Sequence, residues 1–220
     1  MKLLFTGASG FLGSNVRPLL EGMYGVKTVG LSPKDDYTID IAKEIPVLRE
    51  RYDIVLHVAG KAHSVPKTEA ERQVFFDVNL QGTKNLCTAL ERRRVPRAFI
   101  FISTVAVYGC AYGENITEEH PLDGSTPYAM SKRLAEEYLQ NWCRKYNVVL
   151  GIIRPSLIAG PNPPGNLGAM ITGIRRGRYF SIADGRARKS VLMVQDIANL
   201  IPLLARKGDR KSTRLNSSHT

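Results

Sequence analysis

Two short stretches of this 220-residue sequence carry groups at spacings that suit proton transfer. In the stretch YAMSK, Tyr128 and Lys132 stand four residues apart, so a helix places both on one face. An ammonium group beside a phenol stabilises the phenolate and lowers the pKa of the tyrosine, which makes it a usable acid or base. The other stretch, FISTVAVYG (residues 101–109), is an apolar run that breaks into Ser103 and Thr104. Those hydroxyls either close a strand or face a substrate.

A glycine pattern stands at the start of the chain. The stretch GASGFLG places Gly7, Gly10 and Gly13 directly after an apolar run and at the start of a helical pattern. Glycines in that setting permit a tight turn and let backbone N–H groups approach a pyrophosphate at the helix N-terminus. This context favours dinucleotide binding over a plain strand-to-helix turn.

Elements that would position these groups follow from the periodicity. Strands are expected over residues 2–6, 26–31, 53–58, 98–103 and 148–153, and helices over 15–20, 41–52, 69–93 and 127–146. This alternation predicts an α/β fold, a Rossmann-type doubly wound parallel sheet with helices on both faces. After Pro155 we expect a loop at 160–166, a helix at 167–176, a strand at 190–194 and a helix at 197–206 capped by Asp196.

Three regions are therefore expected. Residues 1–155 form an NAD(P)-binding Rossmann domain, and residues 156–208 begin a small substrate-binding region over the C-terminal edge of the sheet. Residues 209–219 resemble an in-frame translation of a sequencing adapter. They are polar and without amphipathic period, so we expect residues 209–220 to be a disordered, non-native tail. On this interpretation the natural chain is cut near Gly208.

Composition excludes several classes of function. The net charge is +11, but the basic residues are scattered, and the tight cluster at Arg92, Arg93 and Arg94 lies where a helix should end. We therefore expect no nucleic-acid partner. No apolar run is long enough to span a bilayer, and the N-terminal apolar stretch is too short for a signal peptide, so we expect a cytoplasmic protein without a membrane partner. The three cysteines show no CxxC spacing, which indicates reduced thiols and no metal site.

Together these motifs resemble the extended short-chain dehydrogenase/reductase family, which comprises nucleotide-sugar epimerases, dehydratases and reductases. The resemblance extends from Met1 to about Ala205. It implies that NAD(P) is bound by the glycine loop, by a pair contacting adenine, by small residues after the fourth strand, and by residues near the nicotinamide. The implied cofactor contacts are Gly7, Ser9, Gly10, Phe11, Leu12, Gly13, Asp40, Ile41, Ala59, Gly60, Lys61, Asn79, Tyr128, Lys132, Pro155 and Leu157.

The same resemblance assigns catalytic roles. Thr104, four residues before the tyrosine of VYG, would hydrogen-bond the sugar oxygen whose proton Tyr128 removes or supplies, with Lys132 tuning Tyr128. Ser103 would bond to the backbone. Sugar-nucleotide 4,6-dehydratases of the family carry Asp-Glu directly after the threonine, and this sequence has Val105 and Ala106 there. The resemblance thus implies that the protein is not a 4,6-dehydratase. It implies hydride transfer at a sugar carbon, carried out by a C4 epimerase or a 4-keto reductase.

For the substrate, the resemblance implies a nucleotide sugar, with a UDP-N-acetylhexosamine favoured and a homodimer as an open option. The substrate contacts would be His63, Thr104, Asn166 and Lys189, although lysine replaces the usual arginine at position 189 and gives a point charge instead of a fork. A plain loop residue is the alternative for His63. His57, in an apolar strand, is expected to be structural.

Two alternatives stay open at this point. An NAD site usually has an acid at the end of the second strand, but Ser32 stands there, with Lys34 close by and Asp35 slightly late. NADP therefore stays open, and NAD is favoured by the habit of the family. The alternative to an enzyme is a non-catalytic dinucleotide sensor on the same fold. Such sensors lose the tyrosine or the lysine, and this chain keeps both.

Overall fold

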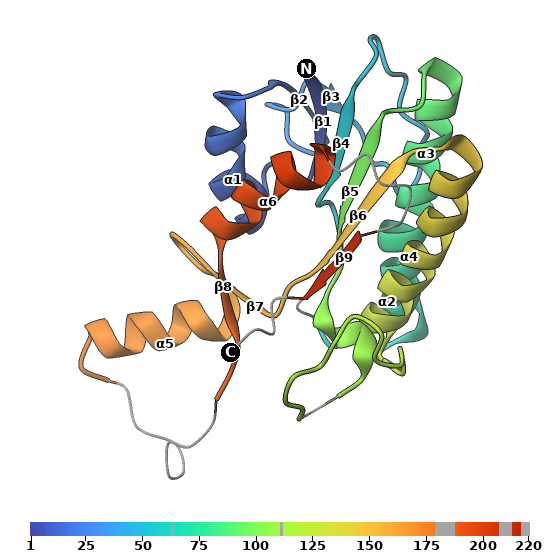
Figure 1. Cartoon of the computed structure of the whole chain (residues 1–220). Coiled ribbons are helices and arrows are strands. Elements are labelled where there is room, and N and C mark those ends of the chain that lie inside the picture. Colours follow the sequence, from blue (N-terminus) through green and yellow to red (C-terminus); the bar gives the residue numbers. More distant parts are fainter. Residues whose placement is uncertain (63, 111, 179–187, 207–212, 217–220) are drawn as a thin grey trace.

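The computed structural model describes residues 1–62, 64–110, 112–178, 188–206 and 213–216. Within these residues the centre is a seven-stranded sheet of order β3-β2-β1-β4-β5-β6-β9, in which all neighbouring strands run parallel (Figure 1). Its strands are β1 (Lys2–Thr6), β2 (Gly25–Gly30), β3 (Tyr37–Thr38), β4 (Ile54–His57), β5 (Ala98–Ile102), β6 (Val149–Arg154) and β9 (Thr213–Asn216). The predicted parallel α/β sheet is confirmed.

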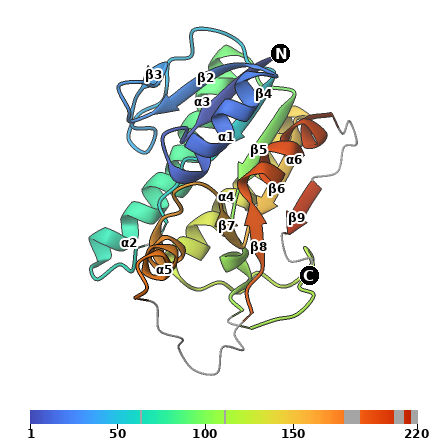
Figure 2. The same cartoon turned by 90° about the vertical axis from the view of Figure 1, so that its left-hand side faces the viewer.

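Helices cover both faces of this sheet. On one face lie α1 (Phe11–Glu21) and α6 (Val194–Arg206), which stand in front of the sheet in Figure 2. On the other lie α3 (Gly82–Arg93) and α4 (Pro127–Tyr146), and α2 (Glu69–Phe76) precedes α3. Successive side chains of a strand point to opposite faces, so Leu3 belongs to the core under α1 and Leu4 to the core under α4.

The chain order reverses between β1 and β4. From β1 the chain goes outward to β2 and β3, and it then returns to place β4 on the other side of β1. Helices on either side of such a switch point leave a crevice at the carboxyl ends of the strands, where α/β proteins bind ligands. GASGFLG follows β1, and the stretch VAG follows β4, so both stretches stand at this crevice.

Two helix predictions need correction. Residues 41–52 were predicted as a helix, but they form turns and irregular backbone. Pro46 lacks an N–H and disfavours the helical conformation at Ile45, so helical hydrogen bonding ends with the bond from the N–H of Glu44 to the carbonyl of Asp40, and Leu48 and Tyr52 are buried from irregular backbone. Residues 69–93 are helical as expected, but a π-helical segment, η1 (Asp77–Gln81), separates α2 from α3.

The region after Pro155 is smaller and looser. A two-stranded parallel sheet pairs β7 (Leu157–Ala159) with β8 (Val191–Met193), and α5 (Gly165–Arg175) lies between them in sequence and away from the main sheet (Figure 1). No residue of α5 is buried. Helix α6 begins at Val194, so Asp196 lies in its first turn instead of capping it.

Four residues of the stretch expected to be a disordered tail, Thr213–Asn216, are described as strand β9. Thr213–Asn216 pair with β6, from Gly151 opposite Thr213 to Arg154 opposite Asn216. Without β9, strand β6 would present a row of unpaired backbone groups, which is a template for any returning chain. The other residues of the expected tail lie outside the described residues. Among the helices that the structure describes, none has the length and apolar composition that a bilayer span requires.

Candidate active site

Tyr128 and Thr104 meet at the carboxyl edge of the sheet. Helix α4 begins beside Tyr128 because the hydroxyl of Thr126 accepts the N–H of Ala129, and Pro127 occupies the first position, where no N–H is needed. Thr104 caps the short 3-10 helix η2 (Val105–Tyr108), with its hydroxyl oxygen 3.1 Å from the N atom of Ala106. Since that oxygen accepts from the backbone, the hydroxyl is left to donate to Tyr128, with which it is hydrogen-bonded.

Electrostatics at Tyr128 differ from the sequence prediction. Burial raises the pKa of Tyr128, and the hydrogen bond from Thr104 lowers it only in part. The direction is thus opposite to the predicted one. The reason lies in Lys132, whose Nζ donates to the carbonyl of Ile102 at 2.9 Å and lies 4.6 Å from the ring centre of Phe101. Two residues on the same helical face, such as Tyr128 and Lys132, need not bring the hydroxyl of one into contact with the amino group of the other.

Lys132 is itself in an unusual environment. Its side chain is 3% exposed, and burial lowers its pKa to about 8, although the carboxylate of Glu136 acts in the opposite direction. Near neutral pH the amino group therefore holds its proton but gives it up more readily than an exposed lysine. A buried ammonium of this kind can stabilise a developing phenolate beside it.

Asn79 lies in the π-helical segment and is buried. Its Oδ1 accepts the N–H of Lys61 at 2.8 Å, and its Nδ2 donates to the carbonyl of Lys61 at 3.1 Å and to the hydroxyl of Ser131 at 2.9 Å. Asn79 therefore clamps the backbone after β4 to the helix that carries Lys132. The extra residue of a π turn often marks such a functional position.

His57 is the centre of a buried hydrogen-bond chain. The hydroxyl of Thr83 donates to the carbonyl of Asn79 at 2.7 Å, so it must accept from His57 Nε2 at 2.9 Å. His57 Nδ1 then accepts from the hydroxyl of Thr6 at 2.6 Å, and Thr6 accepts the N–H of Ala59 at 3.1 Å. This neutral ring joins β1, β4 and α3, which agrees with the predicted structural role.

The glycine loop fits a dinucleotide pyrophosphate. Gly7 has φ +74°, and a methyl group added there would lie 2.6 Å from the N atom of Ala59. A methyl group on Gly13 would lie 2.1 Å from the carbonyl oxygen of Gly7. By contrast, Gly10 has room for a methyl group, and no side chain caps the first turn of α1. The free N–H groups of that turn are therefore left for an anion.

The other predicted cofactor residues are distributed around the crevice. Asp40 accepts the N–H of Ala42 and forms an ion pair with Lys43, and the carbonyl of Ile41 accepts from Asn85. Pro155 is buried and its carbonyl accepts the N–H of Val105, which ties the end of β6 to η2. The structure also describes the other predicted cofactor residues. They are Ser9, Phe11 and Leu12 in and after the glycine loop, Ala59, Gly60 and Lys61 after β4, and Leu157 in β7.

Apart from Thr104, the predicted substrate residues that the structure describes lie on exposed backbone after Pro155. Asn166 is exposed in the first turn of α5, and Lys189 is exposed just before β8. No hydrogen bond or ion pair joins either of them to Thr104 or Tyr128 within the described residues. His63 lies outside the described residues.

Sequence reasoning missed a buried ion pair behind this site. Ser103 was expected to bond to the backbone through its hydroxyl, but its Oγ donates to Oε1 of Glu136 at 2.5 Å. Arg154 donates to both carboxylate oxygens of Glu136, from Nε at 3.0 Å and from Nη2 at 2.5 Å. The sequence held one signal, because Glu136 stands four residues after Lys132 on the same helix face. That spacing indicates a charged neighbour for Lys132 but does not identify Ser103 or Arg154 as partners of Glu136.

Known proteins resemble this chain in sequence and in fold. It is 31% identical over 207 residues to the N-acetyl-α-D-glucosaminyl-diphospho-ditrans,octacis-undecaprenol 4-epimerase of Escherichia coli O157:H7, which covers 90% of this chain and 61% of that protein. It is also 31% identical over 162 residues to the human dTDP-D-glucose 4,6-dehydratase, covering 72% of this chain and 46% of that enzyme. The chain thus spans about half to three-fifths of the length of these relatives.

A solved structure shows the same fold. The UDP-glucose 4-epimerase of Thermotoga maritima, determined with UDP-glucose, superimposes with a TM-score of 0.79 at 25% identity, over 98% of this chain and 76% of that one. The sequence pattern of the family described as NAD dependent epimerase/dehydratase matches residues 3–216, which include the glycine loop, Thr104, Tyr128 and Lys132. A match over nearly the whole chain means that this chain belongs to the NAD dependent epimerase/dehydratase family.

Proposed function

We propose that this chain is the dinucleotide-binding part of a nucleotide-sugar 4-epimerase that acts on a UDP-N-acetylhexosamine. The observation that carries the proposal is the hydrogen bond between Thr104 and Tyr128, on the helix that also carries the buried amino group of Lys132. The N-acetylhexosamine part of this proposal is supported by the bacterial relative, whose name gives an N-acetylglucosaminyl diphosphate linked to undecaprenol as the substrate of a 4-epimerase. A 4-keto reductase would use the same residues, but it would transfer a hydride once from NAD(P)H to a 4-keto sugar, whereas an epimerase removes the hydride and returns it.

The roles of the residues follow from their contacts. Bound NAD would supply the acceptor and donor of a hydride at the sugar carbon, with its pyrophosphate on the N-terminus of α1. Tyr128 would take up and return the proton of the sugar hydroxyl, and Thr104 would donate a hydrogen bond that holds the reacting oxygens in line. Lys132 would keep a positive charge near the phenolate. Asn166 and Lys189, in the region after Pro155, would contact the diphosphate.

Dehydration is not part of this proposal. Loss of water from a 4-keto sugar needs an acid and a base beside the threonine, and η2 presents Val105 and Ala106 there. The resemblance to dTDP-D-glucose 4,6-dehydratases makes this point testable.

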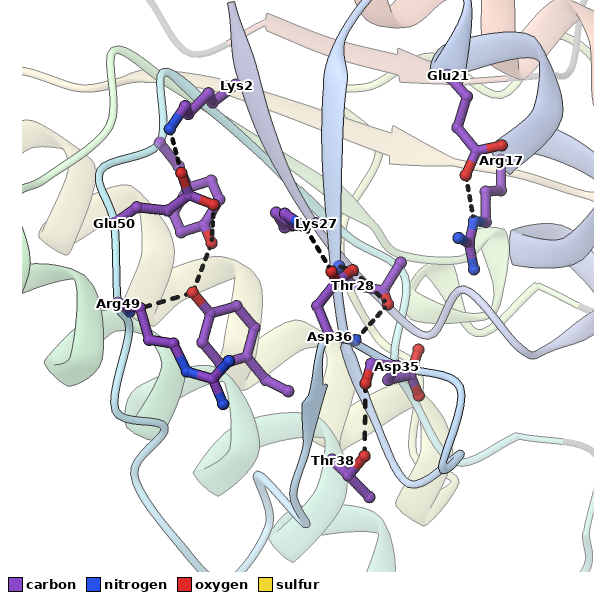
Figure 3. A network of polar contacts seen from close by, with 12 residues as sticks. Lys2, Arg17, Glu21, Lys27, Thr28, Asp35, Asp36, Thr38, Arg49 and Glu50 are labelled. Atoms are coloured by element: carbon purple, nitrogen blue, oxygen red, sulfur yellow. Dashed lines mark hydrogen bonds and ion pairs between the residues drawn. The ribbon is translucent and has the colours of Figure 1, made fainter.

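NAD is the proposed dinucleotide because of Asp35. The chain after β2 folds back so that a methyl group on Gly30 would lie 2.5 Å from Oδ2 of Asp35, which also accepts the N–H of Ser32 at 3.1 Å. Asp36, in contrast, is engaged by Lys27 at 2.7 Å and by Thr28, and its carboxylate points away from that of Asp35 (Figure 3). Asp35 thus supplies the acid at the end of β2 that accepts a ribose hydroxyl and repels a 2′-phosphate.

The test is a screen of nucleotide sugars with NAD and with NADP, in which products are identified by NMR and mass. Interconversion of UDP-N-acetylglucosamine and UDP-N-acetylgalactosamine is the expected result, and the lipid-linked N-acetylglucosaminyl diphosphate is a second substrate to try. A product lighter by one water would overturn the exclusion of dehydration. Asp35→Asn should raise the affinity for NADP relative to NAD by about tenfold, whereas Asp36→Asn should leave this preference unchanged.

A further inference from the structure

The ion pair between Arg154 and Glu136 lies fully inside the protein. Arg154 is 0% exposed and Glu136 is 1% exposed, and the guanidinium grips the carboxylate with two parallel hydrogen bonds. Burying two charges costs desolvation that their attraction barely repays, and apolar residues of similar volume are often as stable in such places. Stability alone therefore does not explain why an ion pair occupies this buried position, and its contacts indicate another role.

One contact of the pair fixes the strand end that carries Thr104. Ser103 donates its hydroxyl to Glu136 at 2.5 Å and its backbone N–H to the carbonyl of Ile153 at 2.7 Å. The residue after Thr104 is held as well, because the N–H of Val105 donates to Pro155. Ser103 is thus held by its hydroxyl to α4 and by its backbone to β6, and the chain on both sides of Thr104 is fixed.

Arg154 extends the same unit to the far end of η2. Its Nη1 donates to the hydroxyl of Tyr108 at 2.8 Å and to the carbonyl of Glu118 at 3.2 Å, and the guanidinium lies 5.0 Å from the centre of the Tyr108 ring. The pair therefore joins β5, η2, the following loop, α4 and β6 around the threonine.

The pair also sets the charge around Lys132. The groups near this amino group are Glu136 on α4, His57 on β4, the side chain of Asn79, the ring of Phe101, and the carbonyl of Ile102. Burial lowers the pKa of His57 to about 3, so that ring is neutral and adds no charge. Within the described part of the chain, Glu136 is then the carboxylate that offsets the burial of Lys132, and with Arg154 it leaves this cluster with one net positive charge.

We propose that the Arg154–Glu136 pair is a positioning unit for the acid–base residues: it fixes the end of β5 before Thr104 and holds a carboxylate one helical turn from Lys132. Its effect on turnover rests on the proposed function, but its effects on Lys132 and on the strand end do not. Arg154 and Glu136 are positioning residues here, since they act through Ser103 and Lys132 and need not touch a substrate.

The first experiment follows the titration of Lys132 by NMR of the 15N-labelled lysine side chains in the 220-residue chain. The signal is assigned by its absence in Lys132→Met. Glu136→Gln keeps the shape but removes the charge, so Lys132 should release its proton at least about 0.5 pH unit lower than in the unchanged chain. The matched control is Glu137→Gln, an exposed carboxylate on the same helix, which should cause no shift. An unchanged Lys132 titration in Glu136→Gln overturns the proposal.

The second experiment uses turnover and its pH profile. In Glu136→Gln the alkaline fall of activity should move to lower pH together with the Lys132 titration, whereas a purely structural role would lower activity equally at all pH values. Ser103→Ala removes only the hydrogen bond to the strand end and leaves both charges in place. It should reduce kcat about fivefold or more, with an unshifted pH profile and NAD affinity within about twofold.

Removing one partner of a buried ion pair is strongly destabilising, so Glu136→Gln can fail to fold. In that case Ser103→Ala still tests the positioning role. Unchanged kcat in Ser103→Ala overturns the positioning role. If the unchanged chain turns over no nucleotide sugar, the proposed function fails. The pair is then judged by the Lys132 titration and by the amide NMR shifts of Thr104, which Ser103→Ala should move and Glu137→Gln should not.

Discussion

Helices α4 and α5 show how differently the two parts of this chain are built. Helix α4 buries Leu139 and Trp142 in the core and brings Tyr128 and Lys132 to the edge of the sheet, whereas α5 buries none of its residues. The side chains proposed to handle the proton and the dinucleotide thus stand on elements fixed by packing. Those proposed to meet the sugar nucleotide, Asn166 and Lys189, stand on exposed backbone. If these assignments hold, the residues that handle the proton are held in place by packing and those that bind the sugar nucleotide are not.

Tyr128→Phe tests the packed part most directly. The ring and its contact with Phe75, at 6.3 Å between centroids, stay in place, and only the proton carrier is lost. Turnover should fall by about 10²- to 10⁴-fold while NAD still binds. Steady-state kinetics and a dinucleotide titration measure both effects. Tyr138→Phe, further along the same helix, is the control and should keep near-normal turnover; normal turnover in Tyr128→Phe would show that another group moves the proton.

His57 predicts how the stability of the packed part depends on pH. Its pKa lies at 6.5 in its ordinary state and at about 3 when buried, so the unfolded chain binds the extra proton between these values. The free energy of unfolding should therefore fall as the pH drops below 6.5, by about 1.4 kcal/mol per pH unit or about 3 kcal/mol by pH 4.5.

Denaturant unfolding at several pH values measures this dependence. His57→Gln keeps hydrogen-bonding groups but does not titrate, so its stability should vary less between pH 6.5 and 4.5 by about that amount. Met170→Ala, at an exposed residue that does not titrate, should keep the slope of the unchanged chain. Equal slopes in both variants would mean that His57 is not held neutral by burial.

Gly10→Val tests whether the space beside the N-terminus of α1 is used to bind the dinucleotide and not to pack the protein. A methyl group on Gly10 would lie 3.4 Å from the carbonyl oxygen of Gly7, an ordinary contact, so the fold should tolerate the change. The side chain would nevertheless occupy the N-terminus of α1, and NAD affinity should drop about tenfold or more. Gly22→Val, where nothing lies within 4 Å, is the control. Unchanged affinity in Gly10→Val would move the pyrophosphate site elsewhere.

The smallest effect is expected in α5. Met170 is 39% exposed, so Met170→Ala should change the free energy of unfolding by no more than about 0.5 kcal/mol. Leu139, in α4, is 0% exposed, and Leu139→Ala should cost about 2–5 kcal/mol by thermal or denaturant unfolding. Similar losses in both variants would show that α5 is packed as firmly as α4 and would end the comparison.

Local patterns were sufficient for the main features of the fold and for the motifs. The glycine loop, the tyrosine–lysine spacing and the order of strands and helices depend on residues close together in sequence, so periodicity and turn chemistry predict them. The bounds of α4 agree with the prediction because both ends are marked locally, by Thr126 and Pro127 at the start and by Asn147 with φ +55° at the end.

The sequence by itself thus determined which chemical groups the chain carries and in which order its elements follow. Tertiary structure alone decided the partners of the buried charges: Ser103 and Arg154 reach Glu136 across 33 and 18 residues of sequence. It also decided that Lys132 turns to the carbonyl of Ile102, that residues 41–52 are irregular, and that Thr213–Asn216 complete the sheet. The physical reason is that a buried polar group must take whichever partner the packed interior places within reach, and no local pattern encodes that choice.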